Sequence, residues 1–168
     1  GAHGVMVPQV NTKEKAEAIA YAAHYFPEGL RGVASTRSSD YGFCAPFPKY
    51  FEMANKRNLT IAQCENVAGV PYLDDICSVD GIDVIFVGPY DLSSSMGQPG
   101  QVGYDSIREV VGKVLEATKK HEKIAGIFTK DAAEAKMYSD MGFRFIIVGT
   151  DIGCMVSGVK NIANSLKG

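Results

Sequence analysis

The apolar residues of the chain gather in five short runs rich in Val, Ile and Phe. Within each run the apolar positions are mostly continuous and seldom alternate with polar ones. A continuous run is typical of a strand that is covered on both faces, as strands are in a parallel sheet. The pattern predicts strands over residues 4–10, 60–65, 83–87, 124–128 and 144–148.

Between these runs, apolar residues recur at the three- and four-residue spacing of an amphipathic helix. The spacing predicts helices over residues 12–25, 47–56, 68–78, 105–121, 131–141 and 152–166. We expect Asn11 to cap the first of these, with Glu14 as the acid of a capping box. We expect Asp131 to cap the helix over 131–141 and Gly142 to end it.

Strands that alternate with helices indicate an α/β fold with a parallel sheet. The chain has 168 residues, of which 46% are hydrophobic and 21% charged, as is usual in soluble globular proteins. No linker interrupts the pattern, so we expect residues 1–168 to form a single domain. A strand at the very first residues suggests that another segment precedes it. Residues 27–48 form the one long irregular stretch, and such connections tend to be functional.

The overall charge and the cysteine pattern exclude several classes of protein. The formal net charge is −2, which leaves no basic surplus to bind nucleic acid. The apolar runs are too short to cross a membrane, and the opening residues lack the features of a secretory signal. The cysteines match neither a zinc site nor a disulfide framework, so we expect reduced thiols in a cytoplasmic protein. They are Cys44, Cys64, Cys77 and Cys154.

Two carboxylates follow neighbouring predicted strands at the point where each strand ends. Glu65 ends the second strand and Asp91 comes shortly after the third. Ligands bind at the carboxyl ends of parallel strands, and adjacent strands would bring these two acids together. Nearby carboxylates repel each other unless a cation or a shared proton lies between them. Two carboxylates with water are usual ligands of Mg²⁺ or Mn²⁺, so the pair predicts a metal site.

The simpler interpretation is that each acid stabilises the start of the helix after its strand, since the helix dipole favours an acid there. Two features favour a shared site instead. Gln63 and Glu65 lie on one face of their strand, because side chains repeat every second residue. Gly88 and Pro89 precede Asp91 and form a rigid turn whose backbone a ligand can approach closely.

The segment Gln-Cys-Glu-Asn at 63–66 and the segment at 79–93, which ends Gly-Pro-Tyr-Asp-Leu-Ser, resemble the HpcH/HpaI aldolase family. That family has a QxE strand end and a GPxDLS strand end at this separation, followed by Met-Gly as at 96–97. Residues 1–10 resemble its fourth barrel strand, and residues 125–128 and 147–151 resemble its seventh and eighth. The resemblance covers nearly the whole chain. It implies a parallel (β/α)8 barrel of the TIM type, of which this chain holds about strands four to eight.

The resemblance also implies roles for four residues. Glu65 and Asp91 would be the ligands of a divalent ion, either Mg²⁺ or Mn²⁺, with Co²⁺ as a further candidate. Gln63 would position a 2-oxo acid, and the backbone around Tyr90 and Asp91 would contact its carboxylate. The implied enzyme is a class II aldolase, a carbon–carbon lyase that cleaves 2-oxo-4-hydroxy acids to pyruvate and an aldehyde with the metal as Lewis acid.

The catalytic His and the substrate-binding Arg of the family belong to earlier strands, and no residue here matches them. A complete barrel runs to about 250 residues. We therefore expect this chain to be inactive without the missing strands. His3, His24 and His121 lie away from the strand ends where barrel chemistry occurs, so we expect surface or structural roles for them. Arg31 matches the RGV stretch of the family and is interpreted as a structural or subunit-contact residue.

The sequence departs from the family at two places. The family usually has a His-Pro pair after its Met-Gly loop, where this chain has Gly103 and Tyr104. Tyr90 replaces the small residue that is common between Pro and Asp. A larger side chain at position 90 is expected to narrow the site or to change the preferred aldehyde. Neither departure removes a metal ligand.

Two other functions stay open on the sequence. One is a non-catalytic fragment or relative that keeps the metal site. The other is a barrel enzyme like citrate lyase or malyl-CoA lyase, which bound coenzyme A would favour. The paired QxE and GPxDLS motifs favour the aldolase, with a small 2-oxo acid as its ligand. Because five strands leave two open edges, and open edges pair with other chains, we also expect a homo-oligomer.

Overall fold

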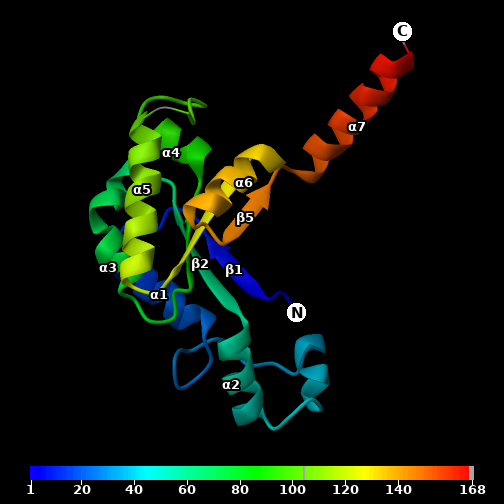
Figure 1. Cartoon of the computed structure of the whole chain (residues 1–168). Helices are drawn as coiled ribbons and strands as arrows, with labels where there is room; N and C mark the ends of the chain where they lie inside the picture. The colour runs from blue at the N-terminus through cyan, green and yellow to red at the C-terminus, as the bar shows by residue number, and fades with distance from the viewer. Residues whose placement is uncertain (104, 167–168) are drawn as a thin grey trace.

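Five parallel strands form one sheet in the computed structural model, which describes residues 1–103 and 105–166. The strands are neighbours in the order in which they occur along the chain, and every adjacent pair is parallel. The sheet curls into a half-barrel, as an incomplete (β/α) barrel does (Figure 1). The strands are β1 (Gly4–Val7), β2 (Leu59–Cys64), β3 (Val84–Val87), β4 (Ile124–Thr129) and β5 (Phe145–Val148).

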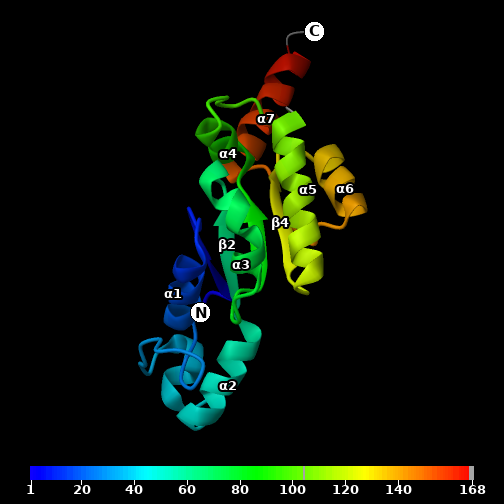
Figure 2. The same ribbon diagram turned by 90° about the vertical axis from the view of Figure 1, so that its left-hand side faces the viewer.

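Most of the helices between the strands cover the convex face of this sheet (Figures 1 and 2). Two short 3-10 helices, η1 (Arg37–Gly42) and η2 (Val67–Tyr72), occur in the connections. The α-helices are α1 (Lys13–Ala23), α2 (Phe47–Arg57), α3 (Leu73–Cys77), α4 (Pro89–Ser95), α5 (Asp105–Lys120), α6 (Ala132–Met141) and α7 (Asp151–Leu166). In the views of Figures 1 and 2, α4 stands at the carboxyl ends of the strands, whereas α2 and η1 lie beyond their amino ends.

The central strand β3 shows why the apolar runs are continuous. Ile85 and Val87 point toward the helices and belong to the main core of the protein. Val84 and Phe86 point to the other face, where they form a second cluster with Ile61. All four side chains of β3 are at most 3% exposed. Burial of a side chain of this kind contributes about 1.5–3 kcal/mol, so both faces stabilise the strand.

The predicted strands are all present, and each differs from its predicted bounds by a few residues at most. The predicted cap of the first helix is wrong, because Thr12 caps α1 in place of Asn11. The hydroxyl of Thr12 accepts a hydrogen bond from the backbone N–H of Lys15 at 3.3 Å. Asn11 instead places its buried Oδ1 beside Gly69, without a hydrogen-bond partner in the described part of the chain.

The predicted ends of α6 are confirmed. Asp131 accepts a hydrogen bond from the backbone N–H of Glu134 at 2.9 Å and so caps the helix. Gly142 follows the last turn with a φ of 115°, a conformation that glycine adopts without strain.

Two connections have more structure than the sequence predicts. The irregular stretch over 27–48 contains η1, and the loop after β3 continues into α4. The helix predicted over 68–78 is divided into η2 and α3, with Pro71 inside η2. Tyr104, which marks a departure from the family pattern, lies outside the described residues.

The last helix, α7, extends away from the rest of the chain (Figure 1). It contains no buried residue between Asp151 and Leu166. Among the helices that the structure describes, none is long and apolar enough to cross a membrane.

Candidate active site

A cavity of about 650 Å³ opens at the carboxyl ends of the strands, on the concave face of the sheet. Side chains from several strands form its apolar wall, namely Met6, Phe86, Phe128 and Ile147. Its polar side chains come from the strand ends and the loops that follow them. These are Gln63, Glu65, Asp91, Lys130 and Thr150. A mostly apolar cavity with a few convergent polar groups is the usual form of a small-molecule site.

Glu65 is the most enclosed of the polar residues in the cavity. Its side chain is 4% exposed, and its Oε1 accepts a 2.9 Å hydrogen bond from the backbone N–H of Gln9, which follows β1. On the other side, a Cβ atom added to Gly88 would lie only 2.7 Å from Oε2 of Glu65. The carboxylate therefore fits closely between the ends of β1 and β3.

The surroundings of Glu65 raise the pKa of its carboxyl group. Burial raises the pKa of its carboxyl above the ordinary value, the hydrogen bond from Gln9 opposes that rise, and the negative charge of Asp91 adds to it. The influence of Asp91 on this pKa agrees with the position of both carboxylates on one cavity.

The interpretation of Glu65 as a helix cap is wrong, because the next residue has that role. Asn66 precedes η2, and its side-chain oxygen accepts a hydrogen bond from the backbone N–H of Ala68 at 3.0 Å. The amide group of Asn66 also donates a hydrogen bond to Oε1 of Gln9 at 3.1 Å. Glu65 is thus left to face the cavity.

Asp91 lies in the first turn of α4 and is exposed. The N-cap residue of this helix, Gly88, has no side chain that could cap it. The negative charge of Asp91 in the first turn interacts favourably with the helix dipole. The buried hydroxyl of Ser93 stabilises this turn with two hydrogen bonds. It donates to the carbonyl oxygen of Tyr90 at 2.7 Å and accepts from the backbone N–H of Gly100 at 3.1 Å. The backbone around Asp91 is therefore held in place by the motif itself.

Gln63 and Tyr90 complete the set of residues that the sequence predicts for the site. Gln63 and Glu65 both line the cavity, as the alternation of side chains along a strand requires. Tyr90 is 49% exposed, and its ring centroid lies 6.1 Å from that of Phe128 in an edge-to-face arrangement. The four residues named from the sequence thus line a single cavity.

The three histidines of the chain lie elsewhere. His3 precedes β1, at the amino ends of the strands. His24 is buried, and its Nδ1 lies 2.8 Å from the carbonyl oxygen of Ala20. His121 lies 2.9 Å from Asp74. No His lines the cavity in the described part of the chain.

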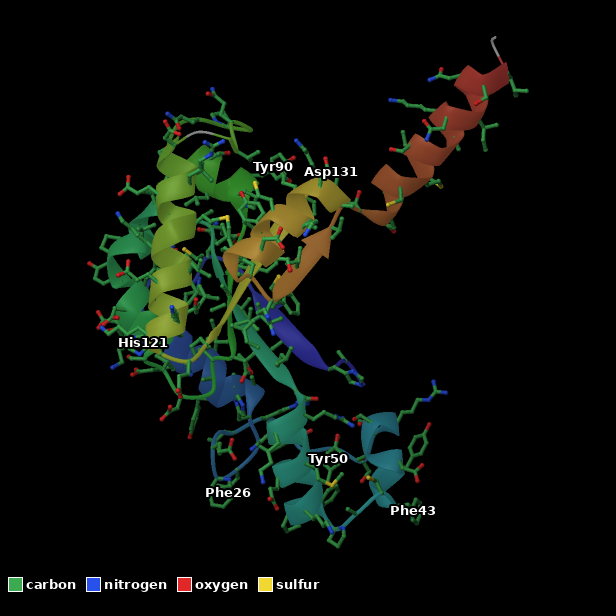
Figure 3. The ribbon with its side chains drawn as sticks, in the orientation of Figure 1. Phe26, Phe43, Tyr50, Tyr90, His121 and Asp131 are labelled. Atoms are coloured by element: carbon green, nitrogen blue, oxygen red, sulfur yellow. The ribbon has the colours of Figure 1, made fainter. Side chains whose placement is uncertain are left out.

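The long stretch over 27–48 does not reach the cavity either, although its length suggests function. It packs against α2 at the opposite end of the strands, where the hydroxyl of Tyr50 donates to Ser38 at 3.2 Å (Figure 3). The guanidinium of Arg31 lies 4.7 Å from the ring centroid of Tyr25, which agrees with the structural interpretation of this arginine. The stretch therefore lies away from this cavity, and its expected function stays a prediction.

The sequence reasoning missed Lys130 and Thr150, which line the cavity from the ends of β4 and β5. The signal was available, since Lys130 directly follows Thr129, the last residue of β4, and Thr150 comes two residues after β5. The rule that ligands bind at the carboxyl ends of parallel strands applies to these strands as well.

Comparison with known proteins shows which family has this fold and these motifs. The model of the HpcH/HpaI aldolase/citrate lyase family matches residues 1–157. The chain belongs to the HpcH/HpaI aldolase/citrate lyase family. A curated relative, the 5-keto-4-deoxy-D-glucarate aldolase of Salmonella arizonae, is 34% identical to it over 168 residues. The match covers 99% of this chain, and the chain spans 64% of the length of that relative.

Solved structures of the family share the fold. A HpcH/HpaI aldolase/citrate lyase family protein from Burkholderia cenocepacia is similar with a TM-score of 0.91 and 29% identity, over 100% of this chain and 66% of that chain. The citrate lyase beta subunit of Mycobacterium tuberculosis, solved with oxaloacetate and magnesium, has a TM-score of 0.59 at 16% identity. The match covers 88% of this chain and 56% of the citrate lyase chain, and at this identity it supports the fold alone.

The donor atoms of this HpcH/HpaI family chain suit a hard divalent cation. Glu65 and Asp91 offer carboxylate oxygens, which are ligands that Mg²⁺ and Mn²⁺ accept. Within residues 1–103 and 105–166, no cluster of three or more His, Cys, Asp or Glu side chains is placed to hold a metal ion. An ion bound here would take two protein ligands and keep its other positions for water and substrate.

Proposed function

We propose that this chain carries the metal-binding part of a divalent-metal-dependent aldolase that cleaves 2-oxo-4-hydroxy acids to pyruvate and an aldehyde. Glu65 and Asp91 are the proposed ligands of the ion, Mg²⁺ or Mn²⁺. The observation that supports this most directly is that two carboxylates, which follow the adjacent strands β2 and β3, line one cavity in a chain of this family. The name of the Salmonella relative, an aldolase, supports the reaction class.

The residues of this chain bind and orient the 2-oxo acid in the proposed reaction. The side-chain amide of Gln63 donates a hydrogen bond to the substrate. The backbone N–H groups of Tyr90 and Asp91, at the amino end of α4, bind its carboxylate. Phe86 and Phe128 exclude water from the reacting carbons. When bound, the ion supplies a positive charge that stabilises negative charge on the 2-oxo group during the cleavage.

We infer that catalysis also needs residues from outside this chain. Cleavage of the bond requires a base for the 4-hydroxyl proton, and among the described residues of the cavity no His is present. The chain spans 64% of the length of its Salmonella relative, and in this proposal earlier strands of the barrel supply the base. We also propose that the protein is a homo-oligomer, because β1 and β5 each have one open edge.

The test is release of pyruvate from a 2-oxo-4-hydroxy acid in the presence of Mn²⁺. The 168-residue chain is compared with a version extended at its N-terminus by the corresponding segment of the Salmonella relative. We expect activity in the extended version alone, and we expect a chelator to abolish it. Turnover by the shorter chain would contradict the need for outside residues.

A binding experiment separates the aldolase from the alternatives. Mn²⁺ affinity is measured by calorimetry for the unchanged chain and for Glu65→Gln and Asp91→Asn. Each substitution should weaken binding by about tenfold or more, since each removes a charged ligand. Glu109→Gln, an exposed acid on α5 that pairs with Lys113, is the matched control. Metal binding without turnover in the extended version would favour a non-catalytic relative. Cleavage restricted to coenzyme A thioesters would favour a malyl-CoA-lyase-like enzyme.

A further inference from the structure

Lys130 is the only positively charged side chain among the described residues that line the cavity. The carboxylates of Glu65 and Asp91 lie at the ends of β2 and β3, whereas Lys130 follows β4. Because the strands are neighbours in chain order, the cavity has an acidic side and a basic side. The proposed ion and the 2-oxo acid occupy the acidic side, which leaves the basic side for the other half of a substrate.

The main chain at Lys130 is held rigidly. Its backbone N–H donates a 2.9 Å hydrogen bond to Oε2 of Glu134, in the first turn of α6. Asp131, the next residue, caps the same helix and lies at the same end of the molecule as Tyr90 in Figure 3. The side chain of Lys130 therefore starts from a fixed point at the rim of the cavity.

The ammonium group of Lys130 keeps its hydrogen-bond donors available. Its Nζ lies 3.7 Å from Oε1 of Glu134, which is an ion pair but is longer than a hydrogen bond. The side chain is 65% exposed, so this pairing is weak. Thr150 also lines the cavity, and its hydroxyl accepts from the backbone N–H of Gly153 at 3.0 Å. Its own proton is thereby directed to other acceptors.

We propose that Lys130, with the hydroxyl of Thr150, is a specificity-determining site that binds a carboxylate on the aldehyde half of the substrate. This inference rests on the proposed function, because it places the 2-oxo acid at Glu65 and Asp91. The preferred substrate is then a 2-oxo-4-hydroxy diacid. On cleavage its C3–C4 bond breaks, the C4 hydroxyl loses its proton to become an aldehyde, and C3 gains a proton to become the methyl group of pyruvate. The second product keeps the carboxylate at Lys130.

The alternative role for Lys130 is structural, as a helix-surface partner of Glu134. The two roles predict different effects of substituting Lys130 on the binding of charged and uncharged ligands. A structural lysine affects all ligands alike through the shape of the site. A lysine that binds a carboxylate affects only ligands that carry one at the matching position.

The first experiment measures binding by calorimetry with Mn²⁺ present. The ligands are 2-oxohexanedioate and 2-oxohexanoate, which have the same length and differ only in a terminal carboxylate. We expect Lys130→Met to weaken binding of the diacid by about tenfold, the effect of losing a hydrogen bond to a charged group, and to leave the monoacid unchanged. Lys130→Arg should retain most of the affinity. Lys136→Met, which removes an exposed lysine that pairs with Asp140 on α6, is the control.

The outcomes separate this site from the proposed function. Equal weakening for both ligands, or none for either, would overturn the role of Lys130 and leave the metal site standing. If neither acid bound the unchanged chain with Mn²⁺, the proposed function would fail and the role of Lys130 with it. In the N-terminally extended version, Lys130→Met should raise KM for the hydroxy diacid with little change in kcat. A fall in kcat for substrates without the second carboxylate would contradict the proposal.

Discussion

The backbone N–H of Gln9 donates a 2.9 Å hydrogen bond to Oε1 of Glu65 and so joins the end of β1 to the end of β2. Gln9 adopts a φ of 55°, which is uncommon for a residue with a side chain. Such conformations persist where the surrounding contacts enforce them, often at functional sites. Gly88 approaches the same carboxylate from β3. The orientation of Glu65 is therefore fixed from both neighbouring strands before any ligand binds.

We predict that Gly88→Ala disrupts metal binding while the fold persists. The added Cβ would lie 2.7 Å from Oε2 and 3.0 Å from Cβ of Glu65, so the carboxylate has to move. Displacement of this proposed metal ligand should reduce Mn²⁺ affinity by about tenfold to a hundredfold. Calorimetry gives the affinity, and circular dichroism reports whether the fold is retained.

Gly112→Ala is the matched control for this substitution. Gly112 is exposed on α5, and nothing lies within 4 Å of an added Cβ. Alanine at such a position should stabilise the helix by about 0.5–1 kcal/mol and leave Mn²⁺ affinity unchanged. Unchanged affinity in Gly88→Ala would show that the close approach of residue 88 to Glu65 has no influence on the metal.

The sequence predicts the strands well because β3 and its neighbours are buried on both faces, which leaves an unbroken apolar run. It predicts the acids of the site because they follow strands directly. It does not predict η1, where Asp40 and Tyr41 have φ values of 48° and 54°, a left-handed conformation that residues with a side chain rarely adopt. The same rule applies to Lys130, which follows β4, but the side of the cavity on which it lies depends on the order of strands in the sheet, which a local pattern does not contain.

The four cysteines should differ sharply in their reactivity. Burial raises the pKa of Cys64 to about 12, with contributions from the nearby Cys77 and Glu65. Burial also raises the pKa of Cys77 to about 12, and the charge of Asp74 adds to it. The thiolate is the reactive form, so both should resist alkylation in the folded protein at neutral pH.

The measurement is the number of thiols labelled by iodoacetamide before and after denaturation. Cys44 and Cys154 are exposed and should react in the native state. The double variant Cys44→Ser with Cys154→Ser should therefore remain unlabelled until it is unfolded. Rapid labelling of the folded double variant would show that Cys64 and Cys77 are more accessible than their burial indicates.

Asp74 should make the stability of the protein depend on acidic pH. Hydrogen bonds from Lys120 and His121, at 2.7 and 2.9 Å, lower the pKa of Asp74 below its ordinary value of 3.8. A lowered pKa in the folded state means that the contribution of Asp74 is fully present above 3.8. It is lost as the pH falls through the lower, folded-state pKa.

The check is the urea midpoint of the unchanged chain and of Asp74→Asn over this acidic range. The unchanged chain should be more stable above pH 3.8, and the difference should close as the pH decreases below that value. Asp75→Asn, on the same helix, is the control and should follow the unchanged chain. A difference that stays constant down to the lowest pH would mean that the contacts of Asp74 with α5 do not stabilise the fold.

The apolar face of α7 should bind a second copy of this chain. Its large side chains remain exposed, for example Val159 at 61% and Ile162 at 66%, and the helix stands away from the rest of the chain (Figure 1). An isolated helix of about this length is only marginally stable in water, so α7 needs a surface to pack against. Light scattering should therefore give a mass above the 18.0 kDa of one chain. Val159→Glu with Ile162→Glu should shift the protein toward the monomer, whereas Lys160→Glu should not. A monomeric unchanged chain at high concentration would exclude self-association through α7.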